Sequence, residues 1–581
     1  MLNPTPTDNT SLPRRLGDFP TIVAALDYAA RGETGLNFHS ARGDLAEVLT
    51  YARLRDEALD LAGRLAGLGL KPGDHVALVA ETEADFARAF FACQYAGLAP
   101  APLPLPQGFG GKQAYIDQLR GLMQACRPKA AIAHADLLGY VEAAADGLEL
   151  LFLGNVATLA NRPSVPVEHA AQPADVAYIQ FSSGSTRFPM GIVVTQRALM
   201  ANVIGITAHG LQVREQDRAV SWLPLYHDMG LVGFFLAALA CQISVDLMAT
   251  RDFARRPLLW LRLIGRNRGT LSYSPTFGYE LCARRAETAP IDDIDLSSWR
   301  AAGIGADMIR PQVLNRFAET FARIGFRATA LVPSYGLAET TLAVSFAPLD
   351  RGMLTDTVDL DRLEDEGIAA APKGPNRRAR SFVACGRPLP AHDVKLIDAT
   401  GAAVGERRVG RVLTRGANLM QGYLDRPAET AAVLDGEGWL DTGDLGYWLG
   451  DQIVITGRAK DLIIVNGRNI WPQDLEWGAE RAVGLRSGDV AAFAVDAGAS
   501  GERVVLLVQC RASAAADRDD LRRKVANAVK DVAGVEGDVV LVAPHALPQT
   551  SSGKLSRSQA KRMFEQGAFA PAAGPSRAAA R

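Results

Sequence analysis

The chain lacks the cysteine patterns that mark metal sites and disulfide frameworks. It has six cysteines among 581 residues, and no two of them stand in the spacing Cys-x-x-Cys. Structural zinc sites and small disulfide-bonded folds are both recognised by such closely spaced pairs. We therefore expect neither zinc nor disulfide bonds to hold this fold together.

A strong net charge and a long hydrophobic run are also missing. The 62 Lys and Arg residues nearly balance 64 Asp and Glu residues, so the chain has no general positive field for nucleic acid or an anionic membrane. The most apolar segment, residues 229–241, is shorter than the roughly 20 residues that span a bilayer, and it predicts a buried helix. Residues 1–20 are polar and broken by proline, unlike a signal peptide. These features predict a cytoplasmic protein with no membrane span and no nucleic-acid partner.

What the chain does contain is an alternation of helical and strand-like segments. Residues 49–81, for example, combine an amphipathic helix, a Gly-Asp turn and a buried strand. Such alternation is typical of a layered α/β body. Because 581 residues exceed what one hydrophobic core usually supports, we expect two or more domains.

Changes of composition suggest where the domains end. Short glycine-rich strands over residues 384–456 predict a β-rich subdomain at the end of a large N-terminal domain, residues 1–457. Residues 458–567 again mix helix and strand and predict a smaller C-terminal domain. The low-complexity residues 568–581 predict a disordered tail.

One loop has the composition of a phosphate-binding site. Residues 181–191 read FSSGSTRFPMG, in which Gly184, Gly191 and small hydroxyl residues allow several backbone N–H groups and hydroxyls to approach one anion. The loop is not the nucleotidase phosphate loop, which ends in Gly-Lys-Ser/Thr, because Arg187 follows Thr186 here. Taken alone, the stretch is also compatible with a polar hairpin between two strands.

Two further motifs have residues suited to a nucleotide. In PSYGLAET, residues 333–340, Tyr335 could stack on a purine, Gly336 lets the base approach, and Glu339 could hold a magnesium ion that bridges phosphates. In WLDTGDLGYW, residues 439–448, Asp444 could accept hydrogen bonds from two ribose hydroxyls. Each motif taken alone favours an ordinary turn over a nucleotide contact.

Two basic motifs follow towards the C-terminus. Residues 457–469 contain Arg458 and Lys460, and residues 548–559 place Lys554 in a Ser/Gly loop. A lone basic residue in such a loop is usually just solvated. The order of all five motifs along the chain is therefore more informative than any one of them.

That ordered set resembles the adenylate-forming superfamily, which includes acyl-CoA synthetases, luciferases and the adenylation domains of peptide synthetases. Within it the chain is most similar to the fatty acyl-AMP ligases. Six segments carry this similarity: FFACQYAGLAPAPLPLP (90–106), SWLPLYHDMGLVG (221–233), YSPTFGYELC (273–282), VPSYGLAETTLAVS (332–345), CGRPLPAHDVKLID (385–398) and GRNIWPQDLE (468–476). The resemblance implies a multi-domain α/β fold with a large N-terminal α/β body, a β-rich subdomain and a small mobile C-terminal α+β domain.

The resemblance also implies a reaction and the residues that perform it. ATP and a medium- or long-chain fatty acid would form acyl-AMP and pyrophosphate, with Mg²⁺ as cofactor. His227 would lie between the acyl carboxylate and the α-phosphate, Lys554 would reach the same place, and Glu339 would ligate the metal. Lys460 would be the hinge of the C-terminal domain, and Met229, Gly230, Phe277 and Gly278 would line the acyl pocket. ATP or AMP contacts are implied for Ser182, Ser183, Gly184, Ser185, Thr186, Arg187, Gly305, Ala306, Asp307, Ser334, Tyr335, Gly336, Leu337, Thr340, Asp444 and Arg458.

Two departures from the superfamily pattern bear on these assignments. Arg187 and Met190 stand where a glycine and a lysine are common in the phosphate loop, so the loop lysine is missing. Residues 304–308 read IGADM where many acyl-AMP ligases have Asn-Gly-Ala-Glu-Pro. The adenine contacts implied for Gly305, Ala306 and Asp307 therefore rest on a weaker match.

The fate of the acyl-AMP depends on residues 347–382. This segment is acidic and then basic, and we predict little core character for it. A surface insertion without function is one interpretation. The resemblance implies another, in which the insertion restricts the domain motion that acyl-CoA synthetases need. The acyl group would then pass to the phosphopantetheine of an acyl carrier protein or of a synthase carrier domain. This chain has no Asp-Ser-Leu attachment signature, so that carrier would be a separate chain.

Three interpretations stay open. The first is a fatty acyl-AMP ligase that acts with a carrier protein. The second is a fatty acyl-CoA ligase or an amino-acid adenylating enzyme; the latter needs a buried carboxylate for the substrate ammonium, and Asp228 is the candidate. The third is a non-catalytic nucleotide-binding partner, which the presence of Glu339, Asp444, Arg458 and Lys554 disfavours.

Overall fold

A nine-stranded sheet forms the centre of the molecule. The computed structural model describes residues 12–106, 111–181, 190–374, 378–465, 468–496, 502–550 and 553–569. In the central sheet the strands from β13 to β1 run parallel, and antiparallel strands close both edges. In spatial order the strands are β17 (Arg387–Pro388), β14 (Ala343–Phe346), β13 (Leu331–Gly336), β12 (Ala301–Ile304), β11 (Leu271–Ser274), β9 (Ala219–Ser221), β10 (Val245–Met248), β1 (Gly35–His39) and β2 (Leu45–Thr50).

Two smaller sheets complete the N-terminal body. One is parallel, in the order β4 (Ala99–Pro102), β3 (His75–Val79), β5 (Ala130–Ala133) and β6 (Phe152–Gly154). The other joins β20 (Gly422–Tyr423), β8 (Gly191–Thr195) and β7 (Val176–Phe181). Strands β7 and β8 pair in antiparallel fashion and flank the predicted phosphate loop. The loop residues Ser182, Ser183, Gly184, Ser185, Thr186 and Arg187 lie outside the described residues.

Helices surround these sheets and supply most of the core. In α2 (Tyr51–Gly67), Leu54, Ala58, Leu61 and Leu65 are buried at helical spacing, and the hydroxyl of Thr50 caps the first turn. The predicted buried helix over 229–241 is confirmed as α8 (Asp228–Gly230), the π-helical turn Leu231–Leu236 and α9 (Ala237–Ala240). The other α-helices of the N-terminal body are α1 (Ile22–Ala29), α3 (Ala84–Tyr95), α4 (Gly111–Cys126), α5 (Leu138–Ala144), α6 (Val156–Leu159), α7 (Gln196–Ile204), α10 (Thr250–Arg255), α11 (Leu258–Arg266), α12 (Thr276–Ala286), α13 (Pro311–Phe321) and α15 (Pro427–Val433).

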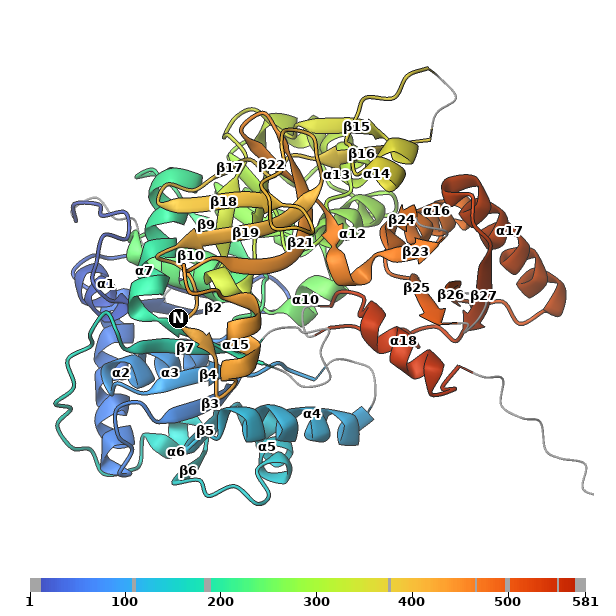
Figure 1. Ribbon diagram of the computed structural model, residues 1–581. Helices are drawn as coiled ribbons and strands as arrows, with labels where there is room; N and C mark the ends of the chain where they lie inside the picture. Colours follow the sequence, from blue (N-terminus) through green and yellow to red (C-terminus); the bar gives the residue numbers. More distant parts are fainter. Residues whose placement is uncertain are drawn as a thin grey trace, which may run out of the picture.

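Two further units follow along the chain. An antiparallel sheet contains β18 (His392–Ile397), β19 (Gly410–Gly416), β21 (Leu440–Leu449) and β22 (Gln452–Arg458). The C-terminal residues form β23 (Ile463–Val465), β24 (Arg468–Ile470), α16 (Pro472–Val483), β25 (Val490–Asp496), β26 (Glu502–Gln509), α17 (Ala515–Ala533), β27 (Gly537–Val542) and α18 (Arg557–Glu565). Figure 1 shows this region, in orange and red, beside the body with α17 on its outer side. The predicted mixed α/β fold is confirmed.

The prediction that residues 347–382 have little core character is wrong. The segment folds into β15 (Thr355–Asp359), α14 (Leu360–Glu366) and β16 (Ala379–Val383), and the two strands pair with each other. Its residues Val358, Leu360, Leu363 and Phe382 are buried against Tyr447, Val454 and Trp471. In the sequence, charged residues separate these apolar positions, so the segment does not look like part of a core. The hydrophobic face of α14 consists of only two leucines, three residues apart.

Charged residues of the same segment contact the C-terminal region. The Arg378 guanidinium donates to the Val532 carbonyl oxygen at 2.6 Å and to the carboxylates of Asp361 and Glu364 at 2.8 Å each. Glu364 is fully buried and also pairs with Arg468. A short distance along the chain, Arg380 pairs with Asp474 at 2.8 Å and lies over the Trp477 ring. The segment and the C-terminal region are therefore joined by paired, largely buried charges.

Candidate active site

A cavity of about 1390 Å³ lies where the body, the β18–β22 sheet and the C-terminal region meet. Trp222, Thr276 and Gly305 line it, and each follows the carboxyl end of a parallel strand, β9, β11 or β12. Ligands in open α/β sheets bind at this edge of the strands. The cavity is therefore the first place to look for the predicted site.

His227 and Asp228 form a pair on one wall of the cavity. The distance between His227 Nδ1 and Asp228 Oδ1 is 2.6 Å, and the Met229 backbone N–H donates to the same oxygen at 2.7 Å. Burial by itself would raise the pKa of Asp228, but His227 and the ammonium of Lys554 outweigh it, and this pKa lies below its ordinary value. Asp228 is thus a charged carboxylate that contacts His227 and the Met229 N–H through its Oδ1.

A second group joins three residues that lie far apart in the sequence. The Tyr335 hydroxyl, at the end of β13, donates to Asp444 Oδ2 at 2.8 Å. Asp444 on β21 faces Arg458 on β22 across the antiparallel pair, with Arg458 Nε 3.2 Å from Asp444 Oδ1. Burial raises the pKa of Asp444, whereas Arg458 opposes this rise. Lys460 follows in the turn Ala459–Asp461 and also lines the cavity.

Glu339 supplies a further carboxylate to the cavity. It lies in the turn Ala338–Thr340, where the Tyr423 hydroxyl donates to its Oε1 at 3.0 Å. Burial raises the pKa of Glu339, and the Tyr423 hydroxyl works against that shift. Within the described residues no cluster of three or more His, Cys, Asp or Glu side chains could hold a metal. The single carboxylate of Glu339 is nevertheless sufficient for a Mg²⁺ site, because this ion is usually bound by one or two carboxylates together with substrate phosphates and water.

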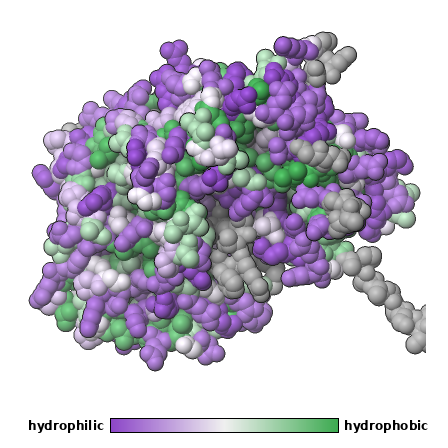
Figure 2. Space-filling view, viewed as in Figure 1, coloured by the Kyte–Doolittle hydropathy of each residue, from purple (hydrophilic) through white to green (hydrophobic). Residues whose placement is uncertain are grey.

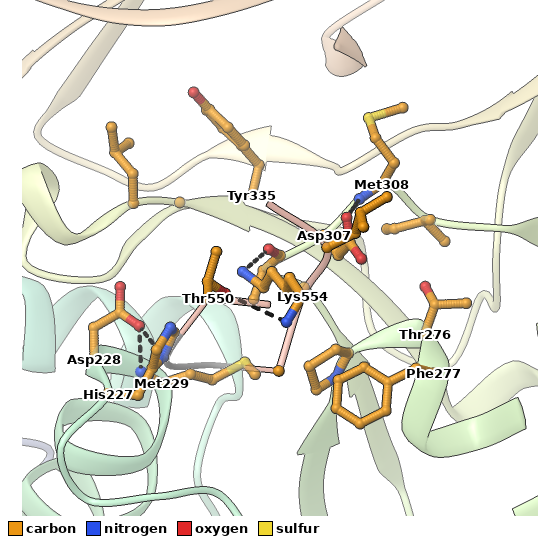
Figure 3. A pocket seen from close by; sticks show the side chains of 18 of the residues that line it. His227, Asp228, Met229, Thr276, Phe277, Asp307, Met308, Tyr335, Thr550 and Lys554 are labelled. Atoms are coloured by element: carbon orange, nitrogen blue, oxygen red, sulfur yellow. Dashed lines mark hydrogen bonds and ion pairs between the residues drawn. The ribbon is translucent and has the colours of Figure 1, made fainter. Parts of the chain in front are cut away.

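Lys554 reaches the cavity from the C-terminal region (Figure 3). Its backbone carbonyl accepts a hydrogen bond from the Thr550 N–H at 2.7 Å, which closes the loop that carries it. Its ammonium donates to the Ala306 carbonyl oxygen, after strand β12. Burial lowers the pKa of Lys554, and the nearby Asp307 and Asp228 act in the opposite direction. The loop therefore places a cation between the strand edge and the His227–Asp228 pair.

Most of the predicted site residues in the described part of the chain line this one cavity. Three do not. The Thr340 side chain is buried, and its hydroxyl donates to the Leu337 carbonyl at 2.8 Å. Gly230 and Gly278 serve packing instead, since a Cβ would lie 2.2 Å from the Pro224 carbonyl oxygen at Gly230 and 2.0 Å from Ser274 Oγ at Gly278. The predicted residues that do line it are His227, Met229, Phe277, Gly305, Ala306, Asp307, Ser334, Tyr335, Gly336, Leu337, Glu339, Asp444, Arg458, Lys460 and Lys554.

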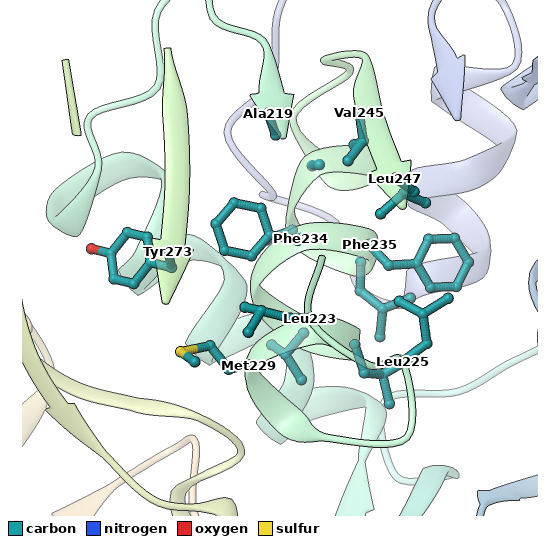
Figure 4. Packing of buried hydrophobic residues seen from close by; sticks show 14 of the residues in the cluster. Ala219, Leu223, Leu225, Met229, Phe234, Phe235, Val245, Leu247 and Tyr273 are labelled. Atoms are coloured by element: carbon teal, nitrogen blue, oxygen red, sulfur yellow. The ribbon is translucent and has the colours of Figure 1, made fainter. Parts of the chain in front are cut away.

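One side of the cavity is apolar. Trp222 stacks on Phe253 with ring centroids 3.8 Å apart, and Phe277 packs against the Trp222 edge at 5.8 Å. Figure 4 shows Met229 and Leu223 beside the buried rings of Phe234 and Tyr273. Sequence reasoning missed Trp222, Phe253 and Tyr423 as site residues. The pairing of β20 with β8 and the hydrogen bond from the Met420 N–H to the Glu339 carbonyl oxygen, which no short motif reveals, bring Tyr423 to Glu339.

Comparison with known proteins identifies the family. The family described as AMP-binding enzyme matches residues 32–424. The chain belongs to this family. Among solved structures, a chain from a study of fatty acyl-adenylate ligases from E. coli and L. pneumophila superposes with a TM-score of 0.91 at 45% identity, covering 96% of this chain and 100% of that one. The resemblance to fatty acyl-AMP ligases is thereby confirmed.

Two relatives of this AMP-binding enzyme carry different names. A Caulobacter vibrioides protein called "Putative acyl-CoA synthetase" is 53% identical and covers 98% of this chain and 99% of its own length. A Moorena producens protein called "Medium-chain-fatty-acid--[acyl-carrier-protein] ligase JamA" is 30% identical and covers 95% and 96%. The names agree on a ligase of acyl groups and differ on the acceptor.

The described helices do not include one that could span a membrane. None of them is both long enough and apolar enough to cross a bilayer. Figure 2 shows hydrophilic residues over most of the face in view, with hydrophobic ones in small groups.

Proposed function

We propose that this AMP-binding enzyme activates a medium- or long-chain fatty acid with ATP and then transfers the acyl group to the phosphopantetheine thiol of a separate carrier protein. The observation that carries the proposal is one cavity that joins an apolar wall to the polar groups Tyr335–Asp444–Arg458, His227 and Lys554. An alkyl chain fits the apolar wall, and a nucleotide fits the polar part.

The first half-reaction joins two anions. A carboxylate oxygen attacks the α-phosphorus of ATP, a bond to that phosphorus forms, and the bond to the pyrophosphate oxygen breaks. Asp444 would hold the ribose hydroxyls and Tyr335 the adenine face, while the ammonium of Lys554 would offset the charge that builds up at the α-phosphate. Mg²⁺ held by Glu339 would neutralise phosphate charge.

The geometry disfavours an amino acid as substrate. An α-ammonium needs a carboxylate in the cavity wall, and the candidate was Asp228. That carboxylate already accepts hydrogen bonds from its own neighbours, with His227 Nδ1 at 2.6 Å and the Met229 N–H at 2.7 Å. Both contacts are to Oδ1, and the nearby ammonium of Lys554, whose charge helps to lower the pKa of Asp228, would repel a second cation at this carboxylate. A second candidate function, acyl-CoA ligation, is favoured by the name of the relative that is 53% identical.

The transfer step requires a moving part. We propose that residues 458–567 form a mobile domain that turns about Lys460, so that a thiol can enter where the Lys554 ammonium lies during adenylation. The hinge position is supported by its place in the short turn Ala459–Asp461, between β22 and β23. The paired charges between the 347–382 segment and the C-terminal region would hold this domain in the adenylation position.

Pyrophosphate release tests the first half-reaction directly. The purified protein with ATP and Mg²⁺ should release pyrophosphate with fatty acids of medium and long chain, and form the matching acyl-AMP. A set of amino acids serves as the comparison. Release that occurs with amino acids but with no fatty acid would contradict the proposal.

Asp444→Asn should weaken ATP binding more than it slows catalysis. Removing one charged hydrogen-bond acceptor costs about 1.5–3 kcal/mol, so the dissociation constant for ATP should rise about tenfold or more. Calorimetry with ATP measures it. Asp451→Asn is the matched control, because Asp451 is an exposed aspartate of the same hairpin, paired with Arg387 outside the cavity. If the Asp444 variant binds ATP as tightly as the parent, Asp444 does not contact the nucleotide and its assigned role is wrong.

A further inference from the structure

The His227–Asp228 pair fixes which nitrogen of the imidazole is free. An ionised carboxylate can only accept hydrogen bonds, so the 2.6 Å contact requires the proton on His227 Nδ1. In the neutral ring the lone pair is then on Nε2.

The free nitrogen faces the cavity. His227 lines the cavity with Lys554 and Met229, and among the described residues none hydrogen-bonds its Nε2. Figure 3 shows the His227 ring with Asp228 on one side and the Lys554 loop on the other. Hydrolases activate a hydroxyl or thiol nucleophile with the same arrangement: a carboxylate holds one nitrogen of an imidazole, and the other nitrogen faces the open cavity.

Adenylation makes no use of such a base. Its nucleophile is already an anion, and no proton changes place when pyrophosphate leaves. Thioester formation does need one, because a pantetheine thiol must lose its proton as its sulfur attacks. The orientation of the imidazole thus suits the second half-reaction better than the first.

We propose that His227 Nε2 is the general base that takes the thiol proton during acyl transfer, with Asp228 as the residue that positions the ring. This inference rests on the proposed function. The sulfur–carbon bond forms at the acyl carbonyl, the thiol proton moves to Nε2, and the carbon–oxygen bond to phosphate breaks. The electron pair leaves with AMP, and no oxidant or further reactant is needed.

A second histidine–aspartate pair provides a control of the same kind. His39 Nε2 is 2.9 Å from Asp246 Oδ1, and Arg218 pairs with the other oxygen at 2.6 Å. This pair links strands β1 and β10 inside the body, and neither residue lines the cavity. Its role is structural, so Asp246→Asn should lower the melting temperature and leave acyl transfer unchanged.

The experiment follows transfer alone, from added acyl-AMP to small thiols of different acidity at one pH. Each thiol is supplied at a concentration high enough to offset, by mass action, the bias against the transfer position. N-acetylcysteamine represents the weakly acidic alkyl thiol of pantetheine, and thiophenol represents a thiol that is already ionised. His227→Gln should slow transfer to N-acetylcysteamine by about a hundredfold or more, the usual contribution of a general base. Its rate with thiophenol should approach that of the parent, because a thiolate needs no base. Asp228→Asn should show the same pattern with a smaller loss, about tenfold, since the ring loses its orientation and not its nitrogen.

The pattern across thiols decides the outcome. If His227→Gln slows both thiols by the same factor, the ring only positions the acyl-AMP and the proposal is overturned. It is also overturned if the parent transfers acyl groups neither to these thiols nor to a phosphopantetheinylated carrier protein and only hydrolyses acyl-AMP. Failure of the proposed function is seen separately, as absence of pyrophosphate release with every fatty acid, because the transfer assay starts from acyl-AMP that is supplied.

Discussion

Replacing Lys554 by alanine should lower kcat for acyl-AMP formation by about a hundredfold or more, comparable to the loss of one charge-stabilising donor. Its ammonium is the cation that the C-terminal region brings to the strand edge, beside Ala306 and the His227–Asp228 pair. Charge at the α-phosphate increases only as the carboxylate attacks. The side chain should therefore act in the transition state, and the ATP dissociation constant should change little.

The measurement is the rate of pyrophosphate release at saturating ATP and fatty acid. Lys561→Ala is the matched control, because Lys561 lies on α18, seven residues further along, and does not line the cavity. The loop should keep its shape in the Lys554 variant, since Thr550 bonds its backbone and not its side chain. A rate within a few fold of the parent would show that the assigned role is wrong.

Local sequence patterns were sufficient for the fold class and for most of the cavity. The alternation of helix and strand predicted the α/β body, and four of the five short motifs predicted residues that meet in one cavity from strands β13, β21 and β22 and from the last loop. The predicted residues of the fifth, the phosphate loop, lie outside the described residues. Each motif places its own side chain at the end of a strand or in a turn. Parallel strands then bring such ends to one edge of the sheet.

What the motifs did not predict depends on three-dimensional contacts, some local and some between distant segments. Gly230 and Gly278 are needed because another backbone or side chain approaches closely, and a motif cannot separate that reason from a ligand contact. The burial of Leu363 and Phe382 depends on Tyr447 and Trp471, which follow many residues later. Likewise, the partner of Asp228 became clear only when its distance to His227 was known.

The last prediction concerns the acceptor. The charged contacts of the 347–382 segment should favour the adenylation position of the C-terminal domain, and a bias of a few kcal/mol leaves the transfer position populated at a per cent or less. Free CoA has few contacts with which to offset that bias. A carrier protein has a docking surface whose interface energy can do so.

Deleting the segment is a poor test, because it would expose the buried Tyr447, Val454 and Trp471. Point changes are sharper. The triple variant Glu364→Gln, Arg378→Ala, Arg468→Ala removes the contact with Val532 and the ion pairs of Glu364 without leaving a buried carboxylate unpaired. The Arg380–Asp474 pair stays in place. Acyl-CoA formation should rise about tenfold or more, while acyl-AMP formation stays within a few fold.

Arg362→Ala is the control, since Arg362 forms an exposed ion pair with Glu366 inside α14, a contact that does not involve the C-terminal region. It should leave the use of CoA unchanged. The comparison needs the parent enzyme with CoA and with a phosphopantetheinylated carrier, both at several concentrations. If the parent already uses CoA as readily as the loaded carrier, the contacts impose no bias. The acyl-CoA ligase alternative then replaces the carrier-dependent function, because the charged contacts would be structural and the domain free to turn.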